Sequence, residues 1–425
     1  MKLLKVDKIE EVRDKLKIYF DTEGFYPPSE AVMLRDAVGR YLAAEICSDT
    51  DIPQFTRSVV DGFAVVAKDT YGTGESAPVF LDVVGTVAMG KPCEIRLEPG
   101  QAAYIPTGGM LPEGSDAVVM IEHTEYLDET TIAVYKPVAP NSGLMNQGDD
   151  FKKGQLLFRR GRRITVKDVG MFAAIGKDQV SVFKKPRVSI LSTGDEIIDI
   201  AETPKPGQVR DINSFTIAAF AEATGAAVRF IEKVPDVKHQ LRSALEDALA
   251  ESDIVLLSGG SSAGNKDMTA EIIDSIGKPG VVTHGIAMKP GKPTIIGIIE
   301  TQEPVTGKKR NKLVVGLPGH PMAAIVAYDV IVNDFMKKHC FCNEEEPIRL
   351  TARITENIHT GDGRETYQLV SLKRNSPEAE WIAEPIHAKS GSISQLMLAD
   401  GYVRIPSLSE GVKINSSVEV TLIGR

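Results

Sequence analysis

Four short loops between residues 192 and 321 combine Gly, Ser or Pro with charged residues. The loops are Ser192–Glu196 (STGDE), Ser258–Asp267 (SGGSSAGNKD), Met288–Pro293 (MKPGKP) and Gly316–Pro321 (GLPGHP). Such loops expose backbone N–H groups and lead into helix N-termini, where phosphate and other oxyanions bind. Glycine has no Cβ, so the backbone can approach a ligand closely. The sequence therefore predicts an anion-binding site built from these loops.

Charged side chains in these loops extend the prediction to metal-assisted phosphate chemistry. Lys289 and Lys292 supply positive charge, and Glu196 and Asp267 supply the hard oxygen ligands that Mg²⁺ uses alongside phosphates. Each feature has an ordinary alternative, because a single Ser-Gly-Gly is often a tight turn and Asp195 could be a helix N-cap. Four such loops at the strand ends of one sheet favour an anion and metal site over turn chemistry.

Three other segments carry weaker signals. Pro53–Ala64 contains an Asp-Gly pair at Asp61, for which physical reasoning alone favours a hairpin turn. Ile105–Gly109 is explained equally well as a plain loop. Arg364, between Gly363 and Glu365, precedes a predicted strand, where its guanidinium would suit bidentate binding of a phosphate or another oxyanion.

Strands and helices alternate through the region that contains the four loops. Predicted strands are Val188–Leu191, Val228–Ile231, Asp253–Leu257, Thr294–Ile299 and Leu313–Val315, and predicted helices are Ser214–Ala223, Val237–Ala250, Thr269–Ile276 and Pro321–Lys337. This pattern predicts a doubly wound α/β domain with a parallel sheet. Ligands of such sheets bind beyond the carboxyl ends of the strands, where the loops lie.

The flanking regions differ from this pattern. Helices are expected over Val6–Phe20 and near Ala31–Glu45, and a mostly β module over Pro53–Tyr135. The β-like stretch Gln155–Ile164 precedes a helix over Val166–Ile175. Five short strands then predict a small β-barrel or sandwich at the C-terminal end, namely Ile348–Ile354, Thr366–Leu372, Trp381–Pro385, Tyr402–Ile405 and Ser417–Leu422.

Length, composition and charge limit the class of protein. The 425 residues suggest two to four domains, and 42% hydrophobic with 25% charged residues is typical of a soluble globular protein. The net charge is -9, and the one short arginine-rich segment, Arg159–Arg163, is interpreted as a turn or hairpin, so nucleic-acid binding is not expected. With no signal peptide and no membrane-spanning stretch, we expect a cytoplasmic protein without membrane contact.

The four cysteines are also consistent with a cytoplasmic location. They are scattered except for Cys340-Phe341-Cys342, which with His339 could form half of a metal site. No second half with zinc-site spacing follows, so these residues are interpreted as an ordinary helix end. A reduced, cytosolic environment is the simplest explanation of such cysteine usage.

The motifs, in their order, resemble the MoeA/gephyrin E-domain family of molybdopterin molybdenumtransferases. Matching segments are Pro53–Ala64, Ile105–Glu122, Gly148–Phe151 (GDDF), Ser192–Glu196, Asp211–Ser214 (DINS), Ser258–Asp267, Met288–Pro293, Gly316–Pro321, Gly363–Glu365 and Ser390–Leu396 (SGSISQL). They extend from residue 53 to residue 396, so the resemblance covers nearly the whole chain.

The resemblance implies a multidomain fold, α/β plus β. It places a discontinuous linker domain at residues 1–50 and 146–183, an inserted mostly-β domain at 51–145, a doubly wound α/β molybdopterin-binding domain at 184–340 and a C-terminal β-barrel at 345–425. It also implies a homodimer whose active site lies between the α/β domain of one subunit and the inserted domain of the other, and contact with the molybdopterin adenylyltransferase.

The resemblance further implies insertion of molybdenum into adenylylated molybdopterin. The substrates would be adenylyl-molybdopterin and molybdate, with Mg²⁺ as the divalent cation, and the products AMP and molybdenum cofactor. Catalytic residues carried over by motif are Asp61, Thr107, Glu196, Asp236 and Asp267, of which Glu196 and Asp267 would also bind the metal. Residues carried over for binding are Asp150, Ser258, Gly259, Gly260, Lys289, Lys292, Pro318, Pro321, Arg364 and Ser390.

The chain departs from the family pattern at Thr56, Ser261, Ala263, Gly285 and His320, while the carboxylates and the Pro/Gly frames are intact. Three alternatives stay open at this point. A stand-alone adenylyltransferase would lack the flanking modules, and a non-catalytic scaffold of the gephyrin E-domain type could lose its carboxylates. A tungstate-inserting paralogue cannot be separated by sequence, because tungstate and molybdate have nearly the same size and charge.

Overall fold

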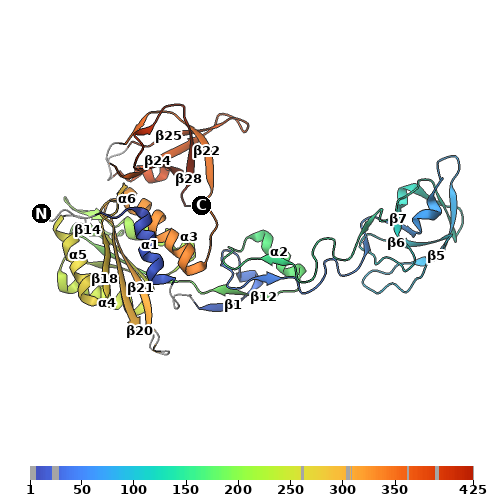
Figure 1. Ribbon diagram of the computed structural model, residues 1–425, viewed down its shortest axis with the longest axis horizontal. Coiled ribbons are helices and arrows are strands. Elements are labelled where there is room, and N and C mark those ends of the chain that lie inside the picture. The colour runs from blue at the N-terminus through green and yellow to red at the C-terminus, as the bar shows by residue number, and fades with distance from the viewer. Residues whose placement is uncertain are drawn as a thin grey trace. The chain divides into compact units, whose positions relative to one another are not determined.

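The computed structural model describes residues 6–21, 28–259, 263–302, 307, 309–360, 363–387 and 392–424, without the side chains of 263–267, 395 and 396. The chain forms two compact units (Figure 1). Unit 1 comprises Met1–Ala44, Arg160–Thr165 and Gln179–Arg425, and unit 2 comprises Glu45–Arg159 and Val166–Asp178. Each unit is described by itself.

A six-stranded sheet forms the centre of unit 1. Its order is β16 (Ala227–Val234), β13 (Arg187–Thr193), β17 (Ile254–Gly259), β21 (Lys309–Leu317), β20 (Ile295–Gln302) and β18 (Pro279–His284). The first four strands are parallel, whereas β20 and β18 are antiparallel to their neighbours. The predicted doubly wound α/β domain is confirmed, but the parallel arrangement holds for four strands only, and β18 was not predicted.

Helices cover both faces of this sheet (Figure 1). On one face, α1 (Ile9–Phe20), α3 (Asn213–Thr224) and α6 (Pro321–Ala327) pack on strand residues such as Ile190, in what we call the α3-side core. On the other face, α4 (Lys238–Glu251) and α5 (Ala263–Ile276) enclose a second core. Strands buried on both faces have continuous apolar sequences, which explains why these strands could be predicted from the sequence.

One glycine and one proline lie at helix ends, as the sequence predicted. Gly225 ends α3 with φ 108°, a left-handed C-cap that favours glycine. Pro321 begins α6 at the first helical position. The helix predicted over Pro321–Lys337 is less regular than expected, because α6 is followed by π-helical turns at Tyr328–Asn333 and Met336–Cys340.

The C-terminal part of unit 1 is a closed five-stranded β-barrel. Its strands follow the order β24 (Glu365–Lys373), β25 (Trp381–Pro385), β22 (Arg349–Ile354), β28 (Ser417–Leu422) and β26 (Gly401–Ile405), and β26 pairs again with β24. The barrel encloses its own core of alternating apolar residues. A short helix, α7 (Ser394–Leu398), was not predicted.

Unit 2 is mostly β, as predicted. Its main sheet follows the order β7 (Ala117–Met120), β4 (Gly62–Val65), β6 (Gln101–Ile105), β5 (Val79–Thr86), β9 (Thr131–Val134) and β8 (Thr124–Tyr126). Two small pairs, β3 (Arg57–Ser58) with β10 (Leu144–Met145) and β2 (Ile46–Cys47) with β11 (Leu156–Phe158), accompany it. Helix α2 (Val166–Ala174) packs Phe172 against Phe158.

Two predicted elements were wrong. The segment Ala31–Glu45 contains no α-helix: β1 (Ser29–Met33) pairs with β12 (Gln179–Phe183), and only Leu34–Asp36 forms a 3₁₀ turn. A strand partner far away in sequence overrode the local helical pattern. The β-like stretch Gln155–Ile164 forms a strand only over Leu156–Phe158, because its arginine-rich remainder forms the turn around Gly161.

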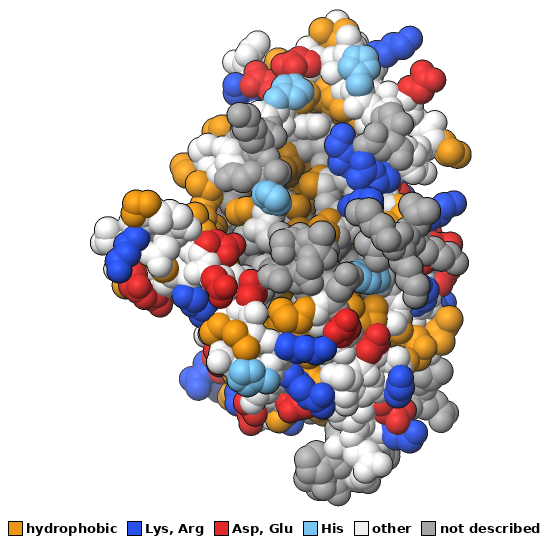
Figure 2. All heavy atoms as spheres, turned by 90° about the vertical axis from the view of Figure 1, so that its left-hand side faces the viewer, with side chains coloured by type: hydrophobic (Ala, Val, Ile, Leu, Met, Phe, Trp, Pro, Cys, Tyr) orange, Lys and Arg blue, Asp and Glu red, His pale blue; other side chains and the backbone are white. Residues whose placement is uncertain are grey.

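Acidic and basic side chains are interspersed on the face shown in Figure 2. Within the described ranges, every helix is too short or too polar to span a lipid bilayer. All four cysteines are free thiols, and Cys340 is buried at the end of its helix, in agreement with the helix-end interpretation.

Candidate functional site

The four predicted loops meet at one edge of the sheet in unit 1. Thr193, at the end of β13, lies opposite Gly259 at the end of β17, and Ser258 lies opposite Leu317 at the end of β21. Strand β20 is antiparallel to β21, so its first residue, Ile295, lies opposite Gly316. The loop before β20 therefore reaches the same edge as the loops after the parallel strands.

Gly259 shows why one of these loops needs glycine. Its φ is 116°, and a Cβ there would lie 1.9 Å from the carbonyl oxygen of Thr193. Any larger residue would push β13 and β17 apart at the point where their loops begin. Two backbones thus approach closely at this position, and Ser258 beside it is buried.

The basic loop is joined to the barrel by a short parallel strand pair. Met288 and Lys289 form β19, which pairs with Glu365 and Thr366 of β24. The backbone N–H of Glu365 donates to the carbonyl oxygen of Ala287 over 3.0 Å. Arg364, which immediately precedes β24, is therefore brought beside the exposed loop lysines, a proximity that their separation in sequence did not reveal.

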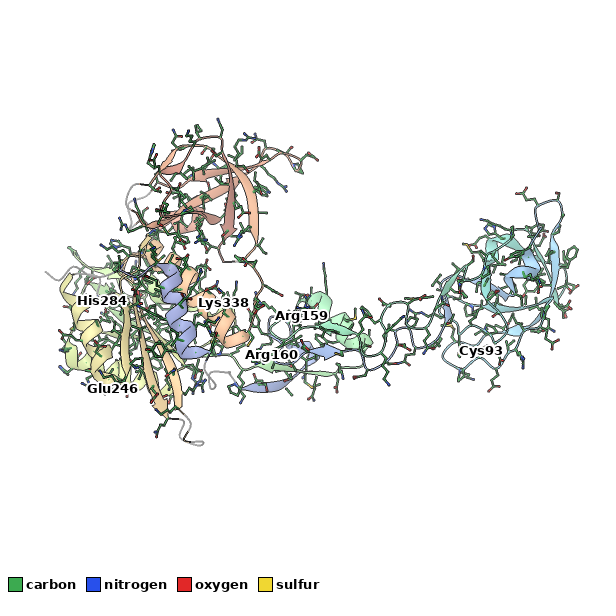
Figure 3. All side chains as sticks on the ribbon, in the orientation of Figure 1. Cys93, Arg159, Arg160, Glu246, His284 and Lys338 are labelled. Carbon is green, nitrogen blue, oxygen red and sulfur yellow. The ribbon has the colours of Figure 1, made fainter. Side chains whose placement is uncertain are left out.

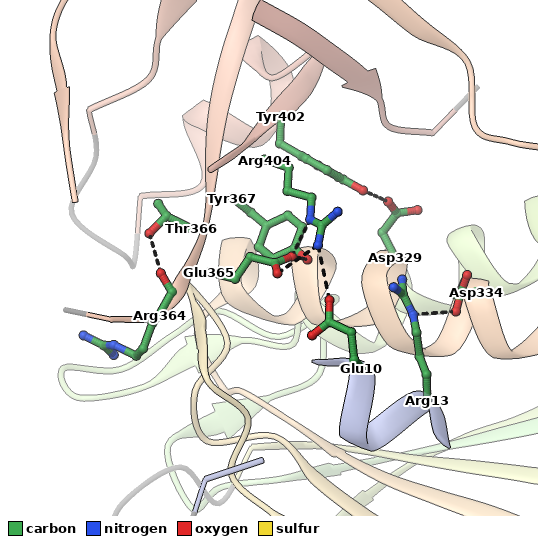
Figure 4. A network of polar contacts seen from close by, with 10 residues as sticks. All are labelled: Glu10, Arg13, Asp329, Asp334, Arg364, Glu365, Thr366, Tyr367, Tyr402 and Arg404. Atoms are coloured by element: carbon green, nitrogen blue, oxygen red, sulfur yellow. Dashed lines mark hydrogen bonds and ion pairs between the residues drawn. The ribbon is translucent and has the colours of Figure 1, made fainter. Parts of the chain in front are cut away.

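Glu365, at the start of β24, is held in this junction by hydrogen bonds from two other barrel residues (Figure 4). Arg404 donates to both carboxylate oxygens of Glu365, over 2.6 and 3.0 Å, and Tyr367 donates to Oε1. Burial raises the pKa of Glu365, but these hydrogen bonds and the charge of Arg404 outweigh it, so the pKa lies below its ordinary value. The residue next to Arg364 is thus a firmly held carboxylate.

Further contacts connect the barrel to the helices of unit 1 (Figure 4). Tyr402 donates to Asp329 over 3.0 Å, and Arg404 also approaches Glu10 of α1 at 3.4 Å. Burial raises the pKa of Asp329, although hydrogen bonds from Asn333 and Tyr402 oppose that shift. The barrel is therefore bound to the α/β domain through both α1 and the last helix.

Carboxylates gather at the β13 end of the same edge. Glu196 is exposed, and its carboxylate lies against Gly194, whose added Cβ would stand 2.9 Å from Oε2. The backbone N–H of Asp236, which follows β16, lies 3.5 Å from Oδ1 of Asp195. Asp236 is thus brought next to the STGDE loop, as its predicted site role requires.

Several predicted site residues cannot be placed in this geometry. The side chain of Asp267 and all of Gly260 and Ser390 lie outside the part of the chain that the structure describes. Among the side chains that are described, no group of three or more His, Cys, Asp or Glu is arranged to hold a metal ion. One exposed carboxylate with a second from Asp267 would still suit Mg²⁺, which usually takes few protein ligands when phosphates supply the others.

The GLPGHP loop is tied to helix α3. Asn213 donates its side-chain amide to the carbonyl oxygen of Gly319 over 2.8 Å. Pro318 is buried and Pro321 half-buried, so both proline rings shape the loop. His320, a departure from the family pattern, is exposed.

Three buried polar atoms near this edge were not predicted as site atoms. Oγ of Ser192, Oγ of Ser214 and Nε2 of His284 (labelled in Figure 3) have no hydrogen-bond partner among the residues that the structure describes. Ser192 and Ser214 belong to the motifs STGDE and DINS, which was the only signal available in the sequence. His284 ends β18, and its register partner Ile295 begins β20.

In unit 2, Asp61 and Thr107 form a hydrogen-bonded pair. The backbone N–H and the hydroxyl of Thr107 both donate to Oδ1 of Asp61, over 2.7 and 3.0 Å. These two bonds lower the pKa of Asp61, because they favour the ionised carboxylate. The sequence proposed both residues but not their contact.

The hairpin predicted for Asp61-Gly62 is wrong. Asp61 is the last residue of the bend between β3 and β4, and these two strands belong to different sheets. Gly62 is required for packing, since a Cβ there would lie 1.9 Å from the carbonyl oxygen of Val119. Asp150, the third site residue predicted in this unit, is exposed, and its backbone N–H donates to Ile52 over 3.0 Å.

A cavity of about 840 Å³ lies between the barrel and the last helix of the α/β domain. Its lining includes Arg13, Asp329, Lys337, Tyr402 and Arg404 and none of the predicted site residues. This cavity therefore does not coincide with the predicted site residues, and we place the candidate site at the sheet edge where the loops meet.

Three family models match successive parts of the chain. Residues 5–176 match the MoeA N-terminal region (domain I and II), residues 189–338 a probable molybdopterin binding domain, and residues 351–423 the MoeA C-terminal region (domain IV). The three matches follow the same order as the motifs.

Curated relatives and solved structures agree with these matches. A molybdopterin molybdenumtransferase of Nostoc is 32% identical over 345 residues, 81% of this chain and 77% of the relative, and one of Bacillus subtilis is 29% identical over 399 residues, 93% and 90%. A crystal structure of a molybdopterin biosynthesis MoeA protein from Pyrococcus horikoshii superposes with a TM-score of 0.80 at 35% identity and covers 98% of this chain and 99% of that one.

Proposed function

Because the chain belongs to the MoeA family and is therefore an enzyme of molybdenum cofactor biosynthesis, we propose that it inserts molybdenum into adenylylated molybdopterin. The reaction would consume molybdate, require a divalent cation and release AMP and molybdenum cofactor. The chain is accordingly a molybdopterin molybdenumtransferase.

The observation that supports this proposal is that the four loops predicted to bind anions meet at one edge of the sheet, where Arg364 also lies. A substrate with two linked phosphates and an oxyanion needs several positive groups and exposed backbone N–H groups in one place. Lys289 and Lys292 would hold the phosphates, and Ser258, Gly259 and Gly260 would bring backbone donors close to them. Pro318 and Pro321 would shape the adjoining loop.

The carboxylates of the site would bind the metal and position the substrate. Glu196 and Asp267 would hold the divalent cation, which when bound neutralises charge on the phosphoanhydride. Asp236 and Asp150 would help to position the substrate. Oδ1 of Asp195 accepts the backbone N–H of Asp236, and this contact keeps Asp236 beside the STGDE loop.

The molybdate side of the reaction involves other residues. Arg364, Ser390 and Thr107 are the candidate contacts for the oxyanion. The two dithiolene sulfurs of the substrate would replace oxo ligands of molybdate, which leave as water or hydroxide. A water molecule or an oxygen of the oxyanion would attack the phosphoanhydride, so that a new P–O bond forms as the bridge breaks and AMP leaves. Asp61, whose pKa is lowered by hydrogen bonds from Thr107, would orient a water molecule or the oxyanion.

The proposal also includes a homodimer whose site is completed in trans. Asp61 and Thr107 belong to unit 2, whereas the converging loops belong to unit 1. We propose that unit 2 of one subunit supplies its residues to unit 1 of the other, within the four domain ranges expected from the sequence. Cytoplasmic location, Mg²⁺ as the cation and contact with the molybdopterin adenylyltransferase are parts of the same proposal.

The deciding experiment incubates the purified full chain with adenylylated molybdopterin, Mg²⁺ and molybdate, and measures AMP release and cofactor formation. We expect both products to appear together and to depend on the oxyanion. A parallel reaction with tungstate tests the paralogue alternative. Binding of the pterin without AMP release would support the scaffold alternative instead.

A matched pair of variants tests the metal role. Glu196→Gln should lower AMP release on the order of a hundredfold, since removal of a metal-positioning charge removes transition-state stabilisation. Glu202→Gln, an exposed carboxylate a few residues further along, should retain wild-type turnover. Near wild-type turnover of Glu196→Gln at low Mg²⁺ would show that Glu196 is only a surface residue.

A further inference from the structure

Asp7 is a buried carboxylate outside the predicted site. It lies just before α1 and is 8% exposed. Lys15 of α1 forms an ion pair with its Oδ2 atom, and the hydroxyl of Thr283 in β18 donates to the same oxygen over 2.7 Å. Burying two charges costs free energy, and apolar residues of similar volume often stabilise a fold equally well. The pair therefore needs an explanation beyond stability.

The backbone of Asp7 is bound to the segment that leads into the basic loop. Asp7 forms a parallel β-bridge with Ile286. Its N–H donates to the carbonyl oxygen of Gly285 over 3.0 Å, and its own carbonyl oxygen accepts the N–H of Ala287 over 2.8 Å. The carbonyl oxygen of Ala287 in turn accepts the N–H of Glu365 over 3.0 Å. The segment before the loop lysines is thus held between the N-terminal segment and the barrel strand β24.

Gly285, one of the departures from the family pattern, lies at this contact. Its φ is 99°, and a Cβ there would stand 3.1 Å from Cγ1 of Val6. Its N–H donates to the carbonyl oxygen of Thr294 over 2.9 Å, which closes the base of the basic loop. A side chain at this position would be strained by the backbone conformation and would press on Val6. Glycine here therefore suits the close contact with the N-terminal segment.

The direction of Lys289 depends on how this segment is held. Ile286 and Met288 are buried in the α3-side core, whereas Lys289 is exposed. Side chains alternate along an extended segment, so a slip by one residue would turn Lys289 towards the core and Met288 outward. The bridge to Asp7 and the pairing of β19 with β24 fix this register from two sides.

Helix α1 also contacts the barrel that carries Arg364 (Figure 4). Glu10 of α1 lies 3.4 Å from Arg404, and Arg404 holds Glu365 through two hydrogen bonds. One helix is therefore connected to the basic loop through Asp7 and to the start of β24 through Glu10. The loop lysines and Arg364 are positioned relative to the same element.

We infer that Asp7 is a positioning residue for phosphate binding. Its carboxylate, fixed by Lys15 and Thr283, anchors the backbone that sets the register of the segment before Lys289. Asp7 acts through this backbone pairing and not by contact with the substrate. The inference rests on the proposed function, in which Lys289 holds the phosphates, and adds a residue that belongs to none of the motifs.

Pyrophosphate binding to the full chain, measured by titration calorimetry, tests the inference. Asp7→Asn keeps the size of the side chain and removes the charge that pairs with Lys15, so the Kd for pyrophosphate should rise about three- to tenfold, the usual range for one lost hydrogen bond. Thr283→Val, which removes one hydrogen bond to the carboxylate, should give a smaller rise. Unchanged binding in both variants, or a wild-type chain that does not bind pyrophosphate, would overturn the inference.

Steady-state kinetics separate positioning from loss of folded enzyme. In Asp7→Asn the KM for the pterin substrate should rise while kcat stays near the wild-type value, because a phosphate contact is weakened in substrate and transition state alike. A variant that is only less stable would lose active molecules, which lowers the apparent kcat and leaves KM unchanged. That second pattern would contradict a positioning role.

A double-mutant cycle tests whether Asp7 acts through Lys289. The combined variant should bind pyrophosphate about as weakly as Lys289→Ala alone, because the second substitution removes the group that the first displaces. Fully additive losses of affinity would show that Asp7 does not act through Lys289.

Asp253→Asn is the matched control. Asp253 is also a buried carboxylate paired with cations, Arg187 at 3.2 Å and Arg310 at 3.0 Å, but it precedes β17, at the edge of the sheet opposite the loops. This variant should lower the free energy of unfolding and leave pyrophosphate binding unchanged. The same result for Asp7→Asn would show that Asp7 serves only the fold.

The proposed function is judged separately, by AMP release from the wild-type chain. An active wild-type enzyme whose Asp7→Asn variant keeps its KM and its pyrophosphate affinity would refute the inference alone. A wild-type chain that binds pyrophosphate through Lys289, loses affinity in Asp7→Asn and releases no AMP would refute the proposed function and support the anchoring of the loop.

Discussion

Two hydrogen bonds from one residue, Thr107, lower the pKa of Asp61. Thr107→Val removes the hydroxyl donor and keeps the backbone donor, so the pKa of Asp61 should rise part of the way towards the ordinary aspartate value. A carboxylate with a lowered pKa is stabilised above its unfolded pKa, about 3.9, and that contribution is lost as the pH falls. The acid limb of the pH–activity profile should therefore move to higher pH in Thr107→Val.

The measurement is an NMR titration of the Asp61 carboxyl together with a pH–rate profile. Thr124→Val is the control, since the Thr124 hydroxyl donates to the carbonyl of Ile121 and not to a carboxylate. An unchanged Asp61 titration in Thr107→Val would show that the backbone N–H alone sets the pKa.

Lys292 and Arg364 allow phosphate holding to be separated from oxyanion holding. A lysine that contacts phosphate in substrate and transition state alike contributes uniform binding, so Lys292→Ala should raise KM for the pterin substrate with kcat nearly unchanged. The loss should be smaller at high salt, where the wild-type advantage is already screened. Arg364→Ala should instead change the dependence on molybdate concentration.

A two-dimensional titration of pterin substrate against molybdate tests this division. Lys278→Ala, which removes an exposed lysine just before β18 at the opposite edge of the sheet, should behave as wild type. If Lys292→Ala affects only the molybdate axis, or Arg364→Ala only the pterin axis, the assignment of the two groups is wrong.

At the scale of elements, Gly259 and Gly207 form an informative pair. Both have positive φ, 116° and 89°, but only Gly259 has a backbone atom where a Cβ would stand. Gly207→Ala should cost about 1–2 kcal/mol from the left-handed conformation alone. Gly259→Ala adds a clash with Thr193, so its cost should exceed about 3 kcal/mol and the loops of β13 and β17 should lose ligand binding.

Denaturant unfolding of both variants, with pyrophosphate titration, checks this expectation. Equal costs for the two substitutions would mean that the strands separate easily at their ends. The close approach of β13 and β17 would then not be needed to shape the loops.

The sequence predicted elements well where the pattern was local. Buried parallel strands such as β17, and the helix that ends at Gly225, follow from apolar runs and a capping glycine. The helix predicted over Ala31–Glu45 was wrong because β1 is defined by its partner β12, which lies far away in sequence. Local propensity carries no information on such pairing. The irregular turns after α6 could not be predicted for the same reason, since their side chains pack on barrel and helix residues.

The candidate site was likewise predictable only in part. Residue types and strand order sufficed to predict that the three loops after β13, β17 and β21 would meet, since parallel strands end at one edge. The antiparallel pairing of β20, which turns the basic loop to that edge, could not be read from periodicity. Nor could the contact of Thr107 with Asp61, or the unpaired hydroxyls of Ser192 and Ser214, because these depend on side-chain positions rather than on patterns.

At the scale of the whole molecule, mixing two inactive variants tests completion of the site in trans. One variant carries Asp61→Asn and the other Glu196→Gln. In a mixed dimer, one site receives both substitutions and the other receives neither. Random reassociation makes half of the dimers mixed, so activity should recover to about a quarter of the wild-type value.

The measurement is AMP release after co-refolding or co-expression of the two variants, with light scattering to establish a mass about twice the chain mass of 46.0 kDa. Each variant alone provides the baseline. No recovery in a verified mixed dimer would mean that both residues act within one subunit, and a fully active monomer would refute the dimer proposal.

The pairing of β19 with β24 has a consequence for the order in which the enzyme is made. A ribosome releases the basic loop well before it releases the barrel strand that pairs with it, and domains begin to fold in that order. Lys289 thus acquires its strand partner only near the end of translation. A chain that is cut short before the barrel can complete most of its sheet, yet it cannot set the loop beside Arg364, so prematurely terminated products should be unable to complete the reaction.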